Sequence, residues 1–223
     1  MKGIHVVGLT GQTGAGKSTV SSLFRARGIK VIDCDQVSRD VVSGEKSCLA
    51  DLALEFSIAI LNMDGTLNRK KLASIVFGNP QKLSKLNELI FPHIRAEINR
   101  RVEELARQGV PLVVLDAPTL FESGADADCE LIISVLAPEA ERLNRIVVRD
   151  HLTDQEARSR MASQHDDAFY SSRSQLVIMN DGDPELLHIK TLETIDLLER
   201  ALRELNASEQ TQDGSASDPE GAI

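Results

Sequence analysis

Short apolar runs and longer stretches of mixed polarity follow one another along this chain. The short runs contain many β-branched residues, and this pattern predicts buried strands. They cover residues 4–9, 30–33, 111–115, 130–136 and 176–179. In the longer stretches apolar residues recur every three or four positions, which is the spacing of helices with one buried face. Strands that alternate with helices predict an α/β fold whose parallel sheet carries helices on both faces.

Several helical stretches carry start, stop or break signals. The longest covers residues 80–108, and Pro92 inside it predicts either a kink or two separate helices. Thr153 is a suitable N-cap for a helix over residues 154–164. The last helix is expected to end at residue 205, because the chain then changes in composition.

Composition narrows the class of protein. A chain of 223 residues with 42 % hydrophobic residues can bury a substantial core. Its net charge of −9 argues against nucleic acid as the main partner. The chain contains no apolar run long enough to predict a membrane span, and its three cysteines lack metal-ligand spacing. We therefore expect a cytoplasmic protein with reduced thiols and no membrane partner.

The end of the chain has a different character. Residues 206–223 carry four acidic residues and no basic ones in a background of serine, glycine and glutamine. Such a segment cannot bury enough apolar surface to offset the entropy of ordering it. We expect a disordered acidic tail.

A glycine-rich segment joins the first expected strand to the first expected helix. From Gly11 to Ser18 it matches G-x-x-x-x-G-K-S, the pattern of a phosphate-binding loop, or P-loop. Glycines let backbone N–H groups approach phosphate oxygens without Cβ clashes, and the following helix adds its positive N-terminal end. Lys17 can reach the β- and γ-phosphates, and Ser18 can place its hydroxyl on Mg²⁺. The residues expected to contact the nucleotide are Gly11, Thr13, Gly14, Ala15, Gly16, Lys17, Ser18 and Thr19.

Polar residues follow other expected strands at the same edge of the sheet, where ligands of parallel α/β sheets bind. Asp33 could accept a proton from an attacking hydroxyl or hold Mg²⁺ through water. Asp35 could share these roles or cap the next helix. Asp116 could hold Mg²⁺ through water, or it could be a turn residue before a proline. Asn180 also falls at this edge.

An arginine-rich segment follows the fourth expected strand. Guanidinium groups present a planar fork to phosphate oxygens, and a mobile segment that carries them could close over ATP and exclude water. The alternative is a solvated helix face held by pairs of opposite charge four residues apart. Arg145 and Arg149 are the favoured pair, because they lie on one helix face. The segment contains Arg142, Arg145, Arg149, Arg158, Arg160 and Arg173.

Together these motifs resemble the dephospho-CoA kinases, over residues 4–187. The resemblance rests on the P-loop, Val-Ile-Asp-Cys-Asp, Asp-Gly-Thr-Leu with Arg69, Leu-Asn with Pro92, Asp-Ala-Pro-Thr-Leu-Phe-Glu and Arg149-Asp. Gln164 and Asn180 also fit. A P-loop alone is shared by many families, whereas this ordered set is much more specific. The chain departs from the usual family pattern at Phe91, Thr119 and Gln175.

The resemblance implies a three-layer P-loop kinase fold with a helical substrate-binding insertion and a lid. It implies ATP-dependent phosphorylation of the ribose 3′-hydroxyl of dephospho-CoA, with Asp33 as base and with Arg145 and Arg149 near the lid. Mg²⁺ would be held by Ser18 and Asp116. The expected divisions are a core of residues 1–60, 109–140 and 174–205, an insertion of residues 61–108 and a lid of residues 141–173.

Other functions remain open from the sequence. The chain could be another nucleoside or nucleotide kinase of similar architecture, or a family member with weak catalysis. A non-enzymatic alternative is a nucleotide-binding switch that hydrolyses slowly. The Asn-Lys-x-Asp stretch with which switch GTPases often read guanine is absent from the sequence. The sequence leaves the oligomeric state open.

Overall fold

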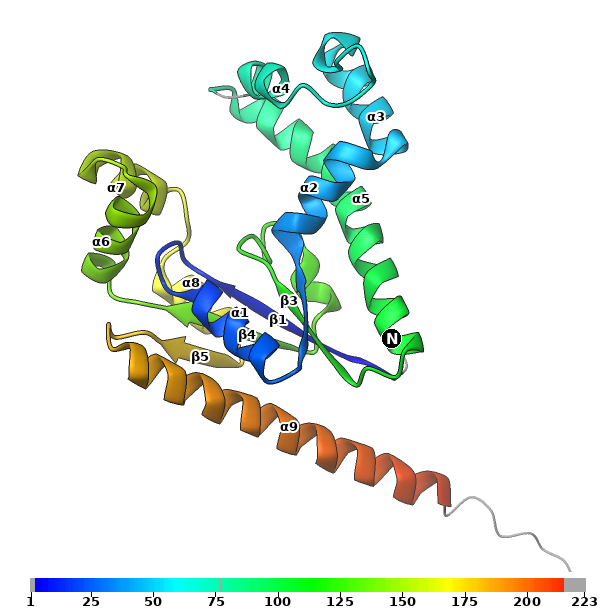
Figure 1. The fold of residues 1–223 in the computed structure, drawn as a ribbon, viewed down its shortest axis with the longest axis vertical. Helices are drawn as coiled ribbons and strands as arrows, with labels where there is room; N and C mark the ends of the chain where they lie inside the picture. Colours follow the sequence, from blue (N-terminus) through cyan, green and yellow to red (C-terminus); the bar gives the residue numbers. More distant parts are fainter. Residues whose placement is uncertain (1–2, 77, 215–223) are drawn as a thin grey trace, which may run out of the picture.

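Five parallel strands form a single sheet in the part of the chain that the computed structural model describes, residues 3–76 and 78–214, with side chains up to residue 205. Their order across the sheet is β2-β3-β1-β4-β5 (Figure 1). The predicted α/β fold with a parallel sheet is confirmed. The strands are β1 (His5–Gly11), β2 (Lys30–Asp33), β3 (Leu112–Asp116), β4 (Leu131–Leu136) and β5 (Leu176–Met179).

Both faces of the sheet are buried. Val6 and its register partner Val113 pack into the core on one face, whereas Val7 and its partner Val114 pack into the core on the other. Successive side chains of a strand point to opposite faces, so a strand covered on both sides must be apolar throughout. This is why the strands are continuous apolar runs in the sequence and not alternating ones.

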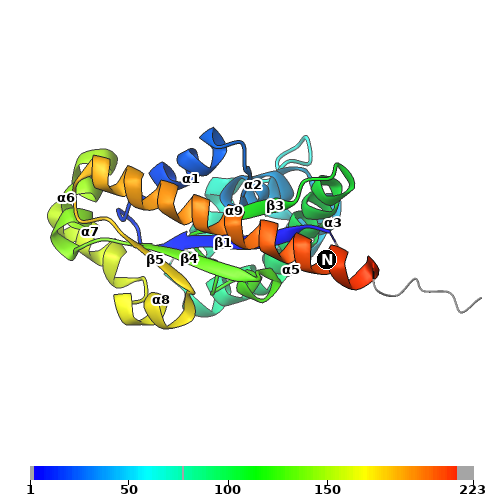
Figure 2. The same ribbon diagram turned by 90° about the horizontal axis from the view of Figure 1, so that it is seen from below.

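One face of the sheet is covered by α1 (Lys17–Ala26) and α9 (Pro184–Gly214), which run beside each other (Figure 2). Phe24 of α1 and Ile195 of α9 are fully buried in the core between these helices and the strands. Because α1 follows the P-loop directly, this packing fixes the direction in which the loop meets the sheet.

The last helix is longer than the sequence predicts. It continues through Gly214, so the expected boundary at residue 205 is wrong for this part of the tail. The composition of residues 206–214 is polar and mixes good helix formers with poor ones, so this stretch extends a helix that is already nucleated and packed before it. Residues 215–223 of the expected disordered tail lie outside the described residues.

The other face of the sheet meets a group of helices that Figure 1 shows as one arm. Its longest member contains Pro92 and is a single helix, so the expected alternative of two helices is wrong. The expected insertion begins at residue 61, yet the helix before it also packs on this long helix. The helices are α2 (Cys34–Gly44), α3 (Lys46–Phe56), α4 (Arg69–Val76) and α5 (Pro80–Arg107), with the short 3₁₀ turn η1 (Ile58–Ile60).

A second arm projects beside the carboxyl edge of the sheet (Figure 1). Thr153 caps α7 as predicted, with Glu156 completing a reciprocal capping box. The sequence did not predict the short helix α8, or the 3₁₀ turn η2 (Ala125–Asp128) before β4. None of the described helices is long and apolar enough to cross a membrane. The arm consists of α6 (Glu139–Asp150) and α7 (Asp154–Ala162), and the following helix α8 (Asp167–Arg173) packs on β4 of the sheet.

The three cysteines are free thiols, as their scattered positions predict. Burial is the main cause that raises the pKa of Cys34 and of Cys129 to about 12. These thiols therefore stay protonated at neutral pH and act as small apolar side chains.

His93 links α5 to α3 within the first arm. Its Nδ1 lies 2.8 Å from Glu45 Oε1 and its Nε2 lies 2.9 Å from Asp51 Oδ2. Both contacts are hydrogen bonds only when both ring nitrogens carry protons, so the charged imidazolium fits this position. Burial lowers the pKa of His93, but the two carboxylates together raise it above its usual 6.5.

We predict that the His93 contacts stabilise the protein in acidic and neutral solution and weaken in alkaline solution. A pKa raised by folding gives stability that is fully present below the unfolded value of 6.5 and is lost as pH rises through the folded value. The free-energy difference between wild type and His93→Gln, from urea unfolding, should be largest near about pH 6 and smaller near about pH 9. His188→Gln, at an exposed position on α9, is the control. A pH-independent difference would contradict the prediction.

Candidate active site

The P-loop backbone approaches its neighbours too closely for side chains. Gly11, Gly14 and Gly16 all have positive φ angles, of 147°, 78° and 100°. A Cβ atom on Gly11 would lie 2.3 Å from the Val135 carbonyl oxygen, and one on Gly14 would lie 2.8 Å from the Arg142 carbonyl oxygen. The first turn of α1 leaves N–H groups without helical partners beside this loop. The loop is therefore a bare backbone cradle at a helix N-terminus, which suits anions.

Lys17 extends from this cradle to the end of β3. Its Nζ donates to Oδ1 of Asp116, and Arg25 lies 3.9 Å from the other carboxylate oxygen. The side chains of Lys17 and Asp116 are only 17 % and 10 % exposed. Asp116 is the register partner of Asp33 on β2. Both predicted aspartates thus lie at the carboxyl edge of the sheet, next to the predicted lysine.

Asp33 has one oxygen engaged and one available. Its Oδ1 accepts a hydrogen bond from the Gln36 N–H at 2.9 Å, so Asp33 is the N-cap of α2. Among the described residues no partner holds Oδ2. Asp35 stands on the first turn of α2, where desolvation raises the pKa of its carboxyl group and nearby Lys17 opposes that shift. The expected alternative of a cap thus belongs to Asp33, not to Asp35.

Asn180 supports the P-loop from the end of β5. It is 5 % exposed, and its Nδ2 donates to the Ala15 carbonyl at 2.8 Å. Its Oδ1 accepts from Arg145 at 3.3 Å and from the Gly182 N–H at 3.3 Å. Arg145 also donates to the Gly14 carbonyl at 3.2 Å. The predicted arginine therefore reaches the loop both directly and through Asn180, for which the sequence indicates a position at this edge but no role.

Two consecutive hydrogen bonds join the P-loop to the second arm. The Thr13 N–H donates to Oε1 of Gln164 at 2.7 Å, and Gln12 Nε2 donates to the His165 carbonyl at 3.1 Å. The first of these bonds places a carboxamide oxygen on an amide of the phosphate loop. The segment between α7 and α8 thus contacts the loop directly, as a lid would.

Comparison with known proteins decides the family. The family model described as dephospho-CoA kinase matches residues 5–185. The chain belongs to the dephospho-CoA kinase family. It is 38 % identical to a dephospho-CoA kinase from Corynebacterium glutamicum over 189 residues, which cover 85 % of this chain and 94 % of the relative.

Solved structures agree with this assignment. A crystal structure of a Thermus thermophilus protein is similar with a TM-score of 0.74 and 31 % identity, and covers 89 % of this chain and 98 % of its own. The dephospho-CoA kinase from Campylobacter jejuni is similar with a TM-score of 0.68 and 25 % identity, and covers 88 % and 98 %. The resemblance seen in the sequence and the P-loop kinase fold are both confirmed. As a member of this family the chain is a phosphotransferase.

The donor set at this kinase site fits a nucleotide with Mg²⁺. The glycine cradle and Lys17 supply positive partners for phosphates, while Ser18 and Asp116 supply oxygen ligands. Within the described residues no cluster of three or more metal-binding side chains occurs. A magnesium ion that is held mainly by phosphates and water needs only one or two protein ligands, so the set is sufficient.

Arg149 does not join the loop. It forms a bidentate ion pair with its neighbour Asp150, with both distances 2.8 Å, and Arg160 pairs with the same carboxylate. The structure therefore brings Arg145 to the P-loop but leaves Arg149 in an exposed ion-pair group at the end of α6. A role of Arg149 in catalysis stays a prediction that needs the arm to rearrange.

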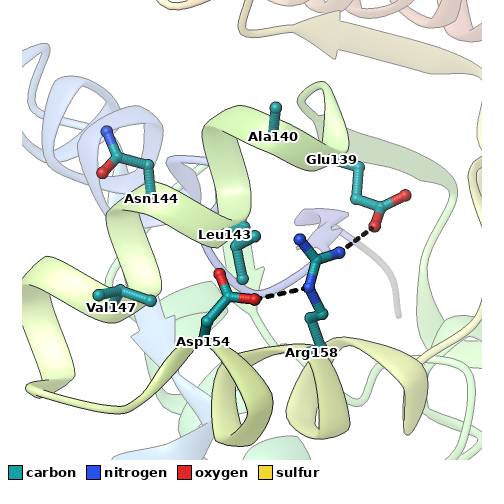
Figure 3. A pocket seen from close by; sticks show the side chains of 7 residues that line it. All are labelled: Glu139, Ala140, Leu143, Asn144, Val147, Asp154 and Arg158. Atoms are coloured by element: carbon teal, nitrogen blue, oxygen red, sulfur yellow. Dashed lines mark hydrogen bonds and ion pairs between the residues drawn. The ribbon is translucent and has the colours of Figure 1, made fainter.

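A hollow of about 470 Å³ lies between α6 and α7 in the second arm (Figure 3). Arg158 crosses it, 2.8 Å from Asp154 and 3.4 Å from Glu139, while Leu143 and Val147 line the α6 side. Exposed ion pairs of this kind contribute little stability. The two helices are joined more firmly by Ile146 of α6 and Ala157 of α7, which are fully buried, and by the ion pair between Asp150 and Arg160.

A second cavity, of about 640 Å³, opens between the P-loop and the second arm. Gln12 and Arg142 line it, and both are more than nine-tenths buried. Gln12 Oε1 and Arg142 Nε have no protein partner. Unpaired buried polar atoms are costly, so this polar space suits water or the polar groups of a ligand.

We predict that Asn180→Ala weakens nucleotide binding. The substitution leaves the buried Ala15 carbonyl and part of Arg145 without partners, a loss typically of about 1–3 kcal/mol. The Kd for an ATP analogue, measured by calorimetry, should rise roughly 10-fold. Asn144→Ala, an exposed asparagine on α6, should leave it unchanged. Equal affinities of the Asn180 variant and wild type would show that the loop keeps its shape alone.

Proposed function

We propose that this chain transfers the γ-phosphoryl group of ATP to the ribose 3′-hydroxyl of dephospho-CoA, giving coenzyme A and ADP. The observation that carries the proposal is the meeting of three groups at one edge of the sheet: the glycine cradle, Lys17 and the free oxygen of Asp33. Membership of the dephospho-CoA kinase family supports the choice of acceptor.

The loop would hold the phosphates of ATP. Backbone N–H groups at the start of α1 point toward a bound anion, and Lys17 would contact the β- and γ-phosphates. Asp116 keeps Lys17 extended before ATP arrives. Mg²⁺, held by Ser18 and Asp116 together with phosphate oxygens, would neutralise charge on the phosphates. Arg145, anchored on the loop by Asn180, would add a guanidinium beside them.

Asp33 would act as the general base. Its Oδ1 is fixed by the Gln36 N–H, which leaves Oδ2 to accept the proton of the 3′-hydroxyl. As the proton moves to this carboxylate, the hydroxyl oxygen bonds to the γ-phosphorus and the bond to the β-phosphate oxygen breaks, releasing ADP. Asp35 is the second candidate at this edge: desolvation raises the pKa of its carboxyl group, Lys17 opposes that shift, and Asp33 adds to it.

The second arm would exclude water. Its contacts with Gln12 and Thr13 place it over the loop, and closure would protect the γ-phosphate from hydrolysis. We further propose a cytoplasmic site of action, where ATP and the reduced state of free Cys34, Cys48 and Cys129 coexist.

We predict that Asp33→Asn lowers turnover by about 10²–10⁴-fold, because asparagine cannot accept the proton. Asparagine is as good an N-cap as aspartate, so α2 should begin at the same residue and the melting temperature should stay within error. ATP affinity should change little. Asp33→Ala is the matched comparison, since it should lose both turnover and part of the stability. Turnover of the asparagine variant within a few-fold of wild type would transfer the role to Asp35.

An acceptor screen tests the activity itself. ADP release should be fastest with dephospho-CoA, slower with adenosine, AMP or uridine, and slowest with no acceptor. Equal rates with and without dephospho-CoA would overturn the proposed function. A preference for another nucleoside or nucleotide would identify a different kinase of the same fold.

A further inference from the structure

Asp116 lies between two cations that come from one side of α1. Lys17, Ser21 and Arg25 follow one another at intervals of four residues, so their side chains share one face of the helix. Lys17 Nζ donates to Oδ1 of Asp116, and Nη2 of Arg25 lies 3.9 Å from Oδ2. Each carboxylate oxygen thus has a cation of its own. Among the residues that the structure describes, no third cation reaches this carboxylate within ion-pair distance.

The guanidinium of Arg25 is oriented by a serine. Ser21 is fully buried, and its Oγ accepts a hydrogen bond from Nη1 of Arg25 at 2.7 Å. The bond leaves the other terminal nitrogen, Nη2, to face Asp116. In the described part of the chain Asp116 is also the one carboxylate within ion-pair distance of Arg25. At 3.9 Å the two groups attract each other without a short hydrogen bond, so the pair can still tighten.

The two cations differ in what nucleotide binding does to them. Under the proposed function Lys17 leaves Asp116 for the β- and γ-phosphates of ATP. A carboxylate whose side chain is only 10 % exposed would then stand without its main partner beside a triphosphate. A buried charge without a partner is costly, and like charges at short distance repel. Nucleotide binding therefore calls for a second counter-ion at Asp116.

Arg25 is placed to be that counter-ion. It begins two turns further along α1 than Lys17, roughly 12 Å away from the loop along the helix axis. Its bond to Ser21 holds it on the far side of Asp116, at Oδ2, while the oxygen that Lys17 vacates is Oδ1. A guanidinium also keeps its charge at all working pH values. Arg25 can thus stay with Asp116 when Lys17 moves.

We propose that Arg25 is a positioning residue that takes over Asp116 when Lys17 turns to the phosphates. Its pairing with Oδ2 lowers the cost of releasing the lysine and keeps Oδ1 directed at the loop, where Mg²⁺ would be held. Arg25 acts through Asp116 and contacts neither nucleotide nor acceptor. The inference rests on the proposed function, because that function supplies the phosphates to which Lys17 moves.

The test measures the Kd of a non-hydrolysable ATP analogue by calorimetry, first without Mg²⁺ and then with it. Arg25→Gln can still donate to Ser21 but carries no charge, so the Kd without Mg²⁺ should rise about 3- to 10-fold. Saturating Mg²⁺ should reduce the difference to about two-fold or less, because the metal then neutralises Asp116. Arg25→Lys keeps the charge and should restore most of the affinity.

A second background shows whether Arg25 acts through Asp116. In Asp116→Asn the side chain needs no counter-ion, so adding Arg25→Gln should leave the Kd without Mg²⁺ within about two-fold of the asparagine variant. Arg27→Gln is the matched control. Its side chain is 45 % exposed against 44 % for Arg25, but it pairs with Asp196 and Glu199 of α9. It should change the Kd in neither condition, and melting temperatures confirm that each variant is folded.

Two results would overturn the inference. An unchanged Kd of the folded Arg25→Gln variant without Mg²⁺ would show that Asp116 needs no second counter-ion. An equal rise in the wild-type and Asp116→Asn backgrounds would show that Arg25 attracts the phosphates directly. Failure of the proposed function is distinguishable, because wild type would then release no ADP that depends on dephospho-CoA, whatever Arg25 contributes to binding of the analogue.

Discussion

The absence of side chains at three loop positions is the constraint on which the site depends. Gly11 lies against the backbone of β4, Gly14 against the backbone of α6, and Gly16 against the amide of Asn180. A methyl group at any of them would force apart elements that come from distant parts of the chain. The same glycines leave the backbone N–H groups uncovered for phosphate. The residues that allow close packing of the fold therefore also shape the cradle.

The three carboxylates at the carboxyl edge of the sheet differ in their partners. Asp116 pairs with Lys17, which keeps the lysine from pairing with Asp33. Asp33 uses one oxygen for the helix cap and keeps the other open. Asp35 is disfavoured as an anion by desolvation. The register of β2 and β3 places Asp33 and Asp116 side by side, and both Lys17 and Arg25 approach Asp116.

The sequence predicts those features of the structure that depend on residues close together in the chain. Buried parallel strands are continuous apolar runs, and the P-loop requires glycines at fixed spacing, so the sheet, the cradle and the aspartates at the strand ends are all predictable. Arg145 and Arg149 are equivalent in sequence, and only the side-chain geometry shows that Arg149 pairs with its neighbour Asp150. The role of Asn180 depends on a contact with Ala15 across most of the chain, which no local pattern encodes. Helix α8 was missed because seven residues are too few to establish a period.

The position of Asn180 in the chain also bears on how the protein is made. The loop it supports lies near the amino terminus, but β5 and the asparagine that follows it are synthesised much later. Helix α9, which closes the core over Phe24, follows later still. Domains fold as units as the chain leaves the ribosome, and here the unit is incomplete until its last strand has emerged. A growing or interrupted chain therefore carries the phosphate-binding motif without its support from Asn180, and the loop reaches its full affinity only after β5 has been made.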